Sequence, residues 1–275
     1  MNANFEELEV LINSLKIKPD VLVCTETWKI FSINRYKLDG YKMYHSGGTV
    51  TAADGVMVYV KQELTQIIKT VNIIELSVLR IELFDKQNKK IIITAIYRLH
   101  SVKLNKFLNA FEKYLLDNKN CSKQIIIGDI NVDIAKTSDE AIEYCTLLAK
   151  FEFISSINSI TRPNENGGTC IDHIFIKGIT NYNSYNIHTM VADHFLTCII
   201  INNCNLNSEK PLSCPKLNYK KVKHQCSITD WKKIVGINQV DLAMEELIKC
   251  IDRIRVEATS KKETKKKSTT KRLDY

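Results

Sequence analysis

Acidic, amide and imidazole side chains stand at the ends of short apolar runs in this 275-residue chain. They are Glu26, Asp129, Asn131, Asp172, Asp193 and His194. If the runs are strands of one sandwich, these side chains converge on one rim. Carboxylates beside an imidazole suit a hydrolysis that needs a hard cation, an activated water and donors for developing negative charge.

The neighbouring runs are rich in aliphatic and β-branched residues, which is typical of buried strands. Strands are predicted at 21–25, 55–60, 91–97, 124–128, 171–176 and 195–201. Amphipathic helices are predicted at 4–16, 104–116 and 139–151, the first with Asn4 as its N-cap. Because the two types mix without a long linker, we expect one α/β domain over residues 1–207.

Each polar residue taken singly also fits an ordinary strand end, an Asx turn or a surface pair. His173 shares a strand face with Ile171 and Phe175, so we expect it to be a core or edge residue. The argument for chemistry therefore depends on all the polar residues meeting at one place.

Charge is distributed unevenly. Residues 1–207 carry 22 Lys and Arg against 22 Asp and Glu, whereas 208–275 carry 17 against 9. A neutral body with a basic extension is typical of a folded unit joined to a segment that binds polyanions, and equally of a solvated linker. The nine cysteines show no paired spacing, so we expect reduced thiols in an intracellular protein, with no disulfide partner. No run is long and apolar enough to predict a membrane partner.

Six segments, taken in order, resemble the endonuclease/exonuclease/phosphatase superfamily. They are Cys24-Thr-Glu-Thr-Trp28, Gly55-Val-Met-Val-Tyr-Val60, Ile96-Tyr-Arg98, Ile127-Gly-Asp-Ile-Asn131, Cys170-Ile-Asp-His-Ile174 and Ala192-Asp-His194. Within the superfamily, the first and third segments and the stretch from Ile160 to Asp172 resemble the apurinic-type endonuclease domain of non-LTR, LINE-like retrotransposons. The resemblance implies a two-sheet, four-layer α/β sandwich.

The resemblance also implies a metal-dependent DNA endonuclease that leaves a 3′-hydroxyl for a reverse transcriptase to extend. Its cofactor would be Mg²⁺ or Mn²⁺, its partners DNA and the reverse transcriptase domain or RNA of the element, and its location the nucleus. The implied roles are as follows: Glu26 and Asp193 at the metal, Asp129 on the attacking water, Asn131 on the water or a phosphate oxygen, His194 on phosphate oxygens with Asp172 as its partner, Tyr97 as a phenol donor to the phosphate, and Thr161 as a substrate contact at the edge of the site.

Two departures from the superfamily pattern are visible. That pattern has a strand with an active-site Asn before the first helix, and Asn2 and Asn4 lie too close to the helix to replace it. The residue before Asp193 is Ala192 where the pattern has Ser. Two alternatives therefore remain: an impaired retrotransposon relic that binds nucleic acid, and a phosphoesterase that acts on other phosphates.

Residues 208–275 differ in composition and hydrophobic pattern from residues 1–207. Apolar residues from Val240 to Ile254 recur at spacings of three and four, which predicts a helix that packs on the body or on a downstream domain. Lys261–Arg272 combines seven basic residues with one acid, Glu263, and is expected to be a disordered linker or a polyanion-binding, nuclear-import segment.

Overall fold

The computed structural model describes residues 4–28, 33–46, 54–70, 76–189, 191–202, 204–208, 218–237 and 239–258. They fall into two compact units, Met1–Lys210 and Pro211–Tyr275, and each is described by itself. The first unit contains α1 (Phe5–Ser14), β1 (Val21–Thr25), a 3₁₀ turn (Ile33–Tyr36), β2 (Tyr41–Ser46), β3 (Val56–Lys61), β4 (Gln66–Thr70), β5 (Ser77–Phe84), β6 (Lys90–Tyr97), α2 (Leu104–Asn118), β7 (Lys123–Asp129), α3 (Asp139–Lys150), β8 (Ile154–Ser155), β9 (Asp172–Lys177), β10 (Tyr182–Ile187) and β11 (Leu196–Ile201). The second contains α4 (Tyr219–Ile228), α5 (Lys232–Val235) and α6 (Val240–Ala258).

The largest sheet has six strands in the order β4-β5-β6-β7-β9-β8. Only β6 and β7 pair in parallel, and α2 connects them; the other pairs are antiparallel. The carboxyl ends of β6 and β7 therefore lie at the same edge as the amino end of β9. This arrangement places the ends of three strands at one rim.

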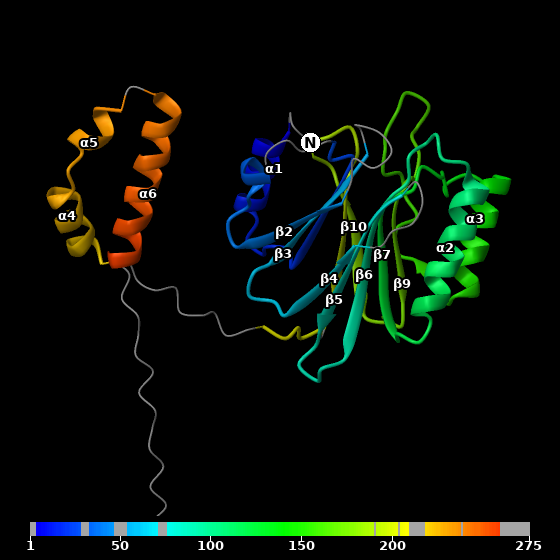
Figure 1. The fold of residues 1–275 in the computed structure, drawn as a ribbon. Coiled ribbons are helices and arrows are strands. Elements are labelled where there is room, and N and C mark those ends of the chain that lie inside the picture. The colour runs from blue at the N-terminus through cyan, green and yellow to red at the C-terminus, as the bar shows by residue number, and fades with distance from the viewer. Residues whose placement is uncertain are drawn as a thin grey trace, which may run out of the picture. The chain divides into compact units, whose positions relative to one another are not determined.

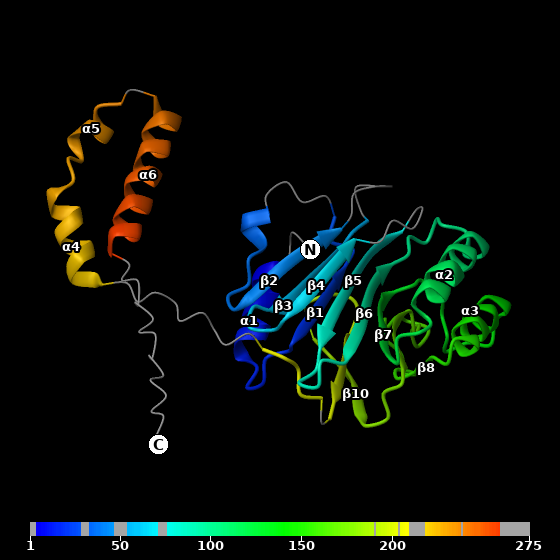
Figure 2. The same ribbon diagram turned by 60° about the horizontal axis from the view of Figure 1, so that its bottom comes forward.

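Four layers build the first unit (Figure 1). Helices α2 and α3 cover one face of the six-stranded sheet, and the strands β1-β3-β2 and β10-β11 lie over the other face, with α1 outside β1 and β3. Figure 2 shows the same layers from another side. The predicted α/β sandwich is thereby confirmed.

Each space between layers holds its own hydrophobic core. Phe111 lies between the helices and the large sheet, Ile81 between the sheets, and Ile12 with Met57 between α1 and the three-stranded sheet. All four side chains are almost completely buried. Burial of such a side chain stabilises a fold by roughly 1.5–3 kcal/mol. Since strands of the large sheet are covered on both faces, β6 reads as a nearly continuous apolar run.

The second layer is interrupted. Within the described residues β1 pairs with β3 alone and β11 with β10 alone, so the layer consists of two separate sheets. Strand β1 packs on β6 and β7, while β11 packs on β9, the neighbour of β7. The interruption thus faces the middle of the large sheet.

The predicted elements form within a few residues of their expected positions, with one correction at the first helix. The backbone carbonyl of Asn4 accepts the N–H of Leu8, but its side chain does not cap the helix. The Asn4 amide instead donates to the carbonyl of Val191, because that loop comes close to the start of α1. The strands β2, β4, β5, β8 and β10 were not expected from the sequence.

In the second unit, α6 contacts α4 and α5, and the expected packing of this helix on the body or on a downstream domain stays a prediction. The backbone N–H of Asn218, at the start of α4, also donates to the carbonyl of Ala258 at the end of α6. The basic segment Lys261–Arg272 lies outside the described residues. Among the helices of the described ranges, none has the length and apolarity that a bilayer crossing requires.

Candidate active site

Three of the predicted residues occupy neighbouring positions at the rim of the large sheet. In the strand register Tyr97 of β6 lies opposite Asp129 of β7, and Asp129 lies opposite Asp172 of β9. Directly opposite residues of neighbouring strands point to the same face of a sheet. The three side chains therefore share the face that packs against the second layer.

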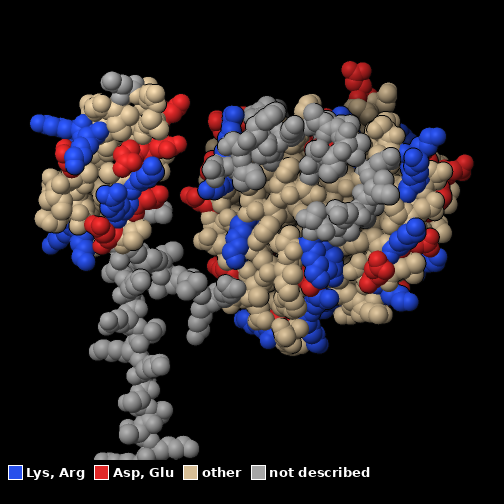
Figure 3. All heavy atoms as spheres, in the orientation of Figure 1, with Lys and Arg blue, Asp and Glu red and all other residues tan. Residues whose placement is uncertain are grey.

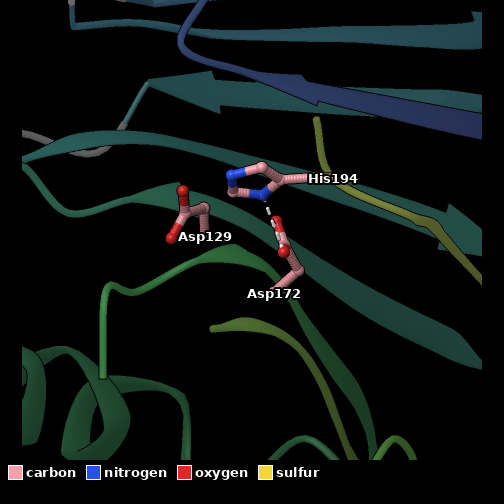
Figure 4. A group of neighbouring side chains, drawn as sticks. All are labelled: Asp129, Asp172 and His194. Carbon is pink, nitrogen blue, oxygen red and sulfur yellow. Dashed lines mark hydrogen bonds and ion pairs between the residues drawn. The ribbon is translucent and has the colours of Figure 1, made fainter. Parts of the chain in front are cut away.

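His194 completes this group from the segment that precedes β11. Its Nδ1 lies 2.8 Å from Oδ2 of Asp172, in a hydrogen bond between partly buried groups. Ligand atoms of Asp129, Asp172 and His194 all lie within 4.8 Å of one another. Figure 4 shows the imidazole reaching over the two carboxylates from a separate part of the chain.

The loop after β7 is shaped by two unusual backbone conformations. Gly128 has φ +149°, and a Cβ there would lie 1.8 Å from the carbonyl oxygen of Ile96, so only glycine fits against β6. Asn131 has φ 55°, and its N–H donates to Oδ1 of Asp129 at 3.0 Å. This turn fixes the Asp129 carboxylate and folds the Asn131 side chain back toward β6.

Arg98 fixes the loop after β7 through hydrogen bonds to its backbone, a role that was not expected from the sequence. Its guanidinium is buried and donates to the carbonyls of Ile130, Asn131 and Val102. The carbonyl of Arg98 accepts the amide of Asn131 at 2.8 Å, and its N–H donates to the carbonyl of Asp129. The available signal was an arginine directly after a fully buried strand, where an unpaired charge is costly.

Glu26 approaches the rim from β1, in the second layer. The hydroxyl of Tyr97 donates to its Oε1 at 2.8 Å, which joins the two layers at the site. Since Tyr97 lies beside Asp129 in the sheet, Glu26 and Asp129 are connected through one side chain. Burial, with the hydrogen bond to Glu26, raises the pKa of Tyr97 well above its ordinary value. The phenol proton is donated to Glu26 in this structure, and the expected contact of Tyr97 with a phosphate stays a prediction.

Asp193 lies apart from the other predicted residues. Its side chain is 71% exposed, and Oδ2 accepts from Nη2 of Arg162 at 2.8 Å. Although burial opposes it, this arginine holds the pKa of Asp193 below its ordinary value. The structure places Asp193 next to an exposed cation and outside the group formed by Asp129, Asp172 and His194; its position near a metal stays a prediction.

Thr161 is completely buried behind Asp172. Its hydroxyl oxygen accepts the backbone N–H groups of Ile171 and Asp172, both at 3.1 Å, and its carbonyl accepts the N–H of Phe195. A buried hydroxyl in this position orients Asp172 and the segment after His194. It has no exposed surface for the substrate contact that was expected of it.

His173 points away from this rim into the core under α3. It is fully buried, hydrogen-bonded to the carbonyl of Cys170 and stacked on Tyr144. Burial lowers the pKa of His173 to about 4, so the ring is neutral. The prediction that His173 is a core residue is confirmed.

Electrostatics hold protons at the site near neutral pH. Burial and the negative charge of Asp172 raise the pKa of Asp129 to about 7. Burial alone would lower the pKa of His194, but its hydrogen bond to Asp172, together with the negative charges of Asp172, Asp129 and Asp193, outweighs burial, and the pKa of His194 is raised. A carboxylate that titrates near neutrality beside a cationic imidazole provides a base and an anion-stabilising group in one place.

The donor set fits a hard divalent cation. Glu26 offers an exposed carboxylate that is oriented by Tyr97, and carboxylate oxygens are the ligands that Mg²⁺ and Mn²⁺ prefer. The pKa of Asp129 is raised by burial first, and then by the negative charges of Asp172 and Glu26, which a cation would offset. We therefore regard Glu26, with Asp129 nearby, as residues able to hold an ion.

Comparisons with known proteins agree with this architecture. A sequence model described as "Endonuclease/Exonuclease/phosphatase family" matches residues 2–194. A family protein from Leptotrichia buccalis superposes with a TM-score of 0.53 at 16% identity, covering 74% of this chain and 95% of that one. The "Endonuclease domain of TRAS1, a telomere-specific non-LTR retrotransposon" superposes with a TM-score of 0.54 at 12% identity, covering 71% and 91%. No curated protein matched.

Proposed function

Because the chain belongs to the endonuclease/exonuclease/phosphatase family, whose members hydrolyse phosphodiesters or phosphate esters, we propose that it is a divalent-metal-dependent endonuclease that nicks DNA. The product would carry a 3′-hydroxyl, the end that a reverse transcriptase of a non-LTR element extends. The observation that carries the proposal is the meeting of Asp129, Asp172 and His194 at one rim, with Glu26 linked to them through Tyr97.

The geometry assigns a distinct task to each residue. Asp129 accepts the proton of the attacking water, for which a pKa of about 7 is well matched. His194, kept cationic by Asp172, stabilises the negative charge that develops on the phosphate oxygens. Asn131 is held by Arg98 beside Asp129, where its amide can orient the water. A bound cation, held by Glu26, would neutralise phosphate charge.

DNA is preferred over other phosphates on two grounds. The motif segments resemble non-LTR retrotransposon endonucleases, and a protein of that kind shares the fold. The excess of basic residues in 208–275 also suits a long polyanion, whereas Figure 3 shows both signs interspersed on one face of the first unit, with no dominant charge there.

A plasmid-nicking assay tests the proposal. Supercoiled plasmid with Mg²⁺ should be converted to the open-circular form, and Asp129→Ala and His194→Ala should each reduce the rate by at least about 100-fold. Glu152→Gln is the matched control, because Glu152 is exposed and pairs with Lys177 at the far end of β9. A phosphoesterase for lipid or small-molecule phosphates would leave the plasmid intact with all four proteins.

One alternative is an impaired relic that binds nucleic acid without cutting it. Within the described residues both β1 and β11 have one unpaired edge, where the strand with an Asn that the superfamily pattern has could pair. A version of the chain extended by such a strand should nick DNA much faster if the protein is an enzyme. An extended chain that binds DNA and still does not cut would support the relic.

The basic segment gives a separate expectation for binding. If Lys261–Arg272 contacts DNA, deletion of residues 261–275 should weaken affinity and reduce the salt slope by about 0.9 per lost phosphate contact. Turnover at saturating DNA should persist, because the proposed catalytic residues all precede Phe195. An unchanged salt slope would mark the segment as a solvated linker.

A further inference from the structure

The segment that leaves β1 has an unusual backbone. Glu26 has φ 51° and Trp28 has φ 61°, both in the left-handed region that bulky residues rarely adopt. Thr27, between them, is buried. Its N–H donates to the carbonyl of Gly55, and its hydroxyl is hydrogen-bonded to Nε2 of His45. Two strained residues thus flank one that is anchored firmly to β3 and β2.

This conformation points Glu26 and Trp28 outward while Thr27 points inward. Trp28 is 49% exposed and is not among the described residues that pack into the three cores. Its Cα lies within about 7 Å of that of Glu26, the longest span of two residues. Trp28 therefore lies close along the backbone to Glu26, the residue whose carboxylate Tyr97 holds at the rim of the proposed active site.

Strained backbone conformations cost free energy, and at the edge of a binding site they indicate a functional reason for the side chains that they position. An indole offers a flat apolar face, whereas the other side chains described at this rim are carboxylates, an imidazole and a phenol. In a nucleic acid, each phosphate carries an aromatic base one sugar away. A phosphate bound at Asp129 and His194 would therefore bring a nucleobase within reach of the neighbouring rim. Other phosphate esters, such as lipid headgroups, have no aromatic face at that position.

We propose that Trp28 is a stacking platform for an unpaired nucleobase next to the scissile phosphate, an inference that rests on the proposed function. Every base has a π-face, so such a platform accepts all four bases and favours sites where the duplex is open or distorted. Trp28 would then contribute to where the enzyme cuts, through the local opening of the duplex and not through base-edge hydrogen bonds.

The tryptophan content makes a direct test available. The chain has two tryptophans, Trp28 and Trp231, and Trp231 lies in the second unit. In a Trp231→Phe background, the emission of the full chain reports on Trp28 alone. Titration in EDTA with a single-stranded oligonucleotide should quench this emission saturably. An oligonucleotide of the same length and charge that carries only abasic sites should bind, as followed by anisotropy of a label, with little quenching.

Kinetics give a second readout. The first substrate is an uncut oligonucleotide duplex with one cleavage site and a base next to the scissile phosphate. With this substrate, Trp28→Ala should raise KM about 5- to 150-fold, and Trp28→Phe should retain much of the affinity. With the same substrate made abasic at that nucleotide, the effect of Trp28→Ala should fall below about twofold. The selectivity for the base-bearing substrate is therefore the quantity expected to collapse.

The outcomes separate this inference from the proposed function. Quenching by base-bearing DNA without any nicking would support stacking and refute the endonuclease. Nicking with unchanged Trp28 emission, or equal quenching by the abasic strand, would overturn stacking and leave the endonuclease. Absence of DNA binding would overturn both, and equal losses on both substrates in Trp28→Ala would assign Trp28 a structural role only.

Discussion

We expect the ionised carboxylate of Asp129 to lower the free energy of unfolding, although the proposed chemistry depends on this residue. Asp129 is 2% exposed and its carboxylate faces Asp172, so the charged form is costly above neutral pH. Asp129→Asn removes that charge and retains an oxygen that can accept the N–H of Asn131. We expect the variant to be inactive and, at alkaline pH without metal, more stable than the unmodified protein.

The size of the effect follows from the pKa. An acid with a higher pKa in the folded state binds its proton more tightly when folded, so the stability it provides at low pH is lost as the pH rises from about 4 to about 7. A rise from 3.8 to about 7 corresponds to about 4 kcal/mol, at about 1.36 kcal/mol per pH unit. Because Asp172 and His194 share this titration, we expect about half of that, ~2 kcal/mol, for the single substitution.

Urea unfolding followed by circular dichroism, in EDTA at pH 5 and pH 8, measures this difference. At pH 5 Asp129 is protonated in the folded protein but already ionised in the unfolded chain, so the variant should be more stable by about two-fifths of the full difference. At pH 8 the variant should be more stable by the full difference. EDTA is essential, since a bound cation would favour the charged carboxylate and mask the effect.

Asp133→Asn is the matched control with the opposite sign. Burial opposes ionisation of Asp133, but N–H donors from Cys170 and Ala135 and the charge of Lys136 hold its pKa below the ordinary value. This substitution should destabilise the protein at pH 8. Equal stability of Asp129→Asn and the unmodified protein at pH 8, or a gain of the same size at both pH values, would refute the argument.

Three further predictions concern the same rim. Asp172→Asn should move both limbs of the pH–rate profile for nicking to lower pH, because Asp172 raises the pKa of His194 as well as that of the catalytic base; an unmoved profile between pH 5 and 9 would contradict this. Arg98→Lys should lower kcat and destabilise the fold by about 1.5–3 kcal/mol in urea, because an ammonium cannot reproduce the three-carbonyl contact and charged hydrogen bonds have that value. Gly128→Ala should lower Tm far more than Gly40→Ala, since both positions have positive φ but only the first would place a Cβ against backbone, at 1.8 Å; similar Tm values for the two variants would be inconsistent with this contact.

Some strands were visible in the sequence and others were not, for a physical reason. Strand β6 is buried on both faces and is therefore an almost continuous apolar run. Strand β5 is equally buried, but its Arg80 and Glu82 lie on one face and form an ion pair, so its sequence looks like that of a surface segment. The half-exposed β10 has few apolar residues and gives no clear periodic signal.

The sequence by itself determined which residues can do chemistry and where each lies relative to its own strand. Residues 124–129 are an apolar run followed by a glycine and an acid, and this order predicts a strand that ends at a carboxylate. Local sequence is enough here, because burial of the run and the backbone freedom of the glycine are local properties of the chain. The family resemblance added the order of the motifs and hence the sandwich, which the matched family and the four layers confirm.

Only the tertiary structure decided which of these residues meet. Asp129 and Asp172 face each other because β7 and β9 pair in one register, and a shift by one residue would turn one carboxylate to the opposite face. The phenol of Tyr97 binds Glu26 across two layers, Asp193 binds Arg162 in an exposed pair, and Arg98 holds the loop that carries Asn131. Such partners are separated by 31 to 71 residues in the chain. Their choice depends on the packing of whole layers, which no local pattern encodes.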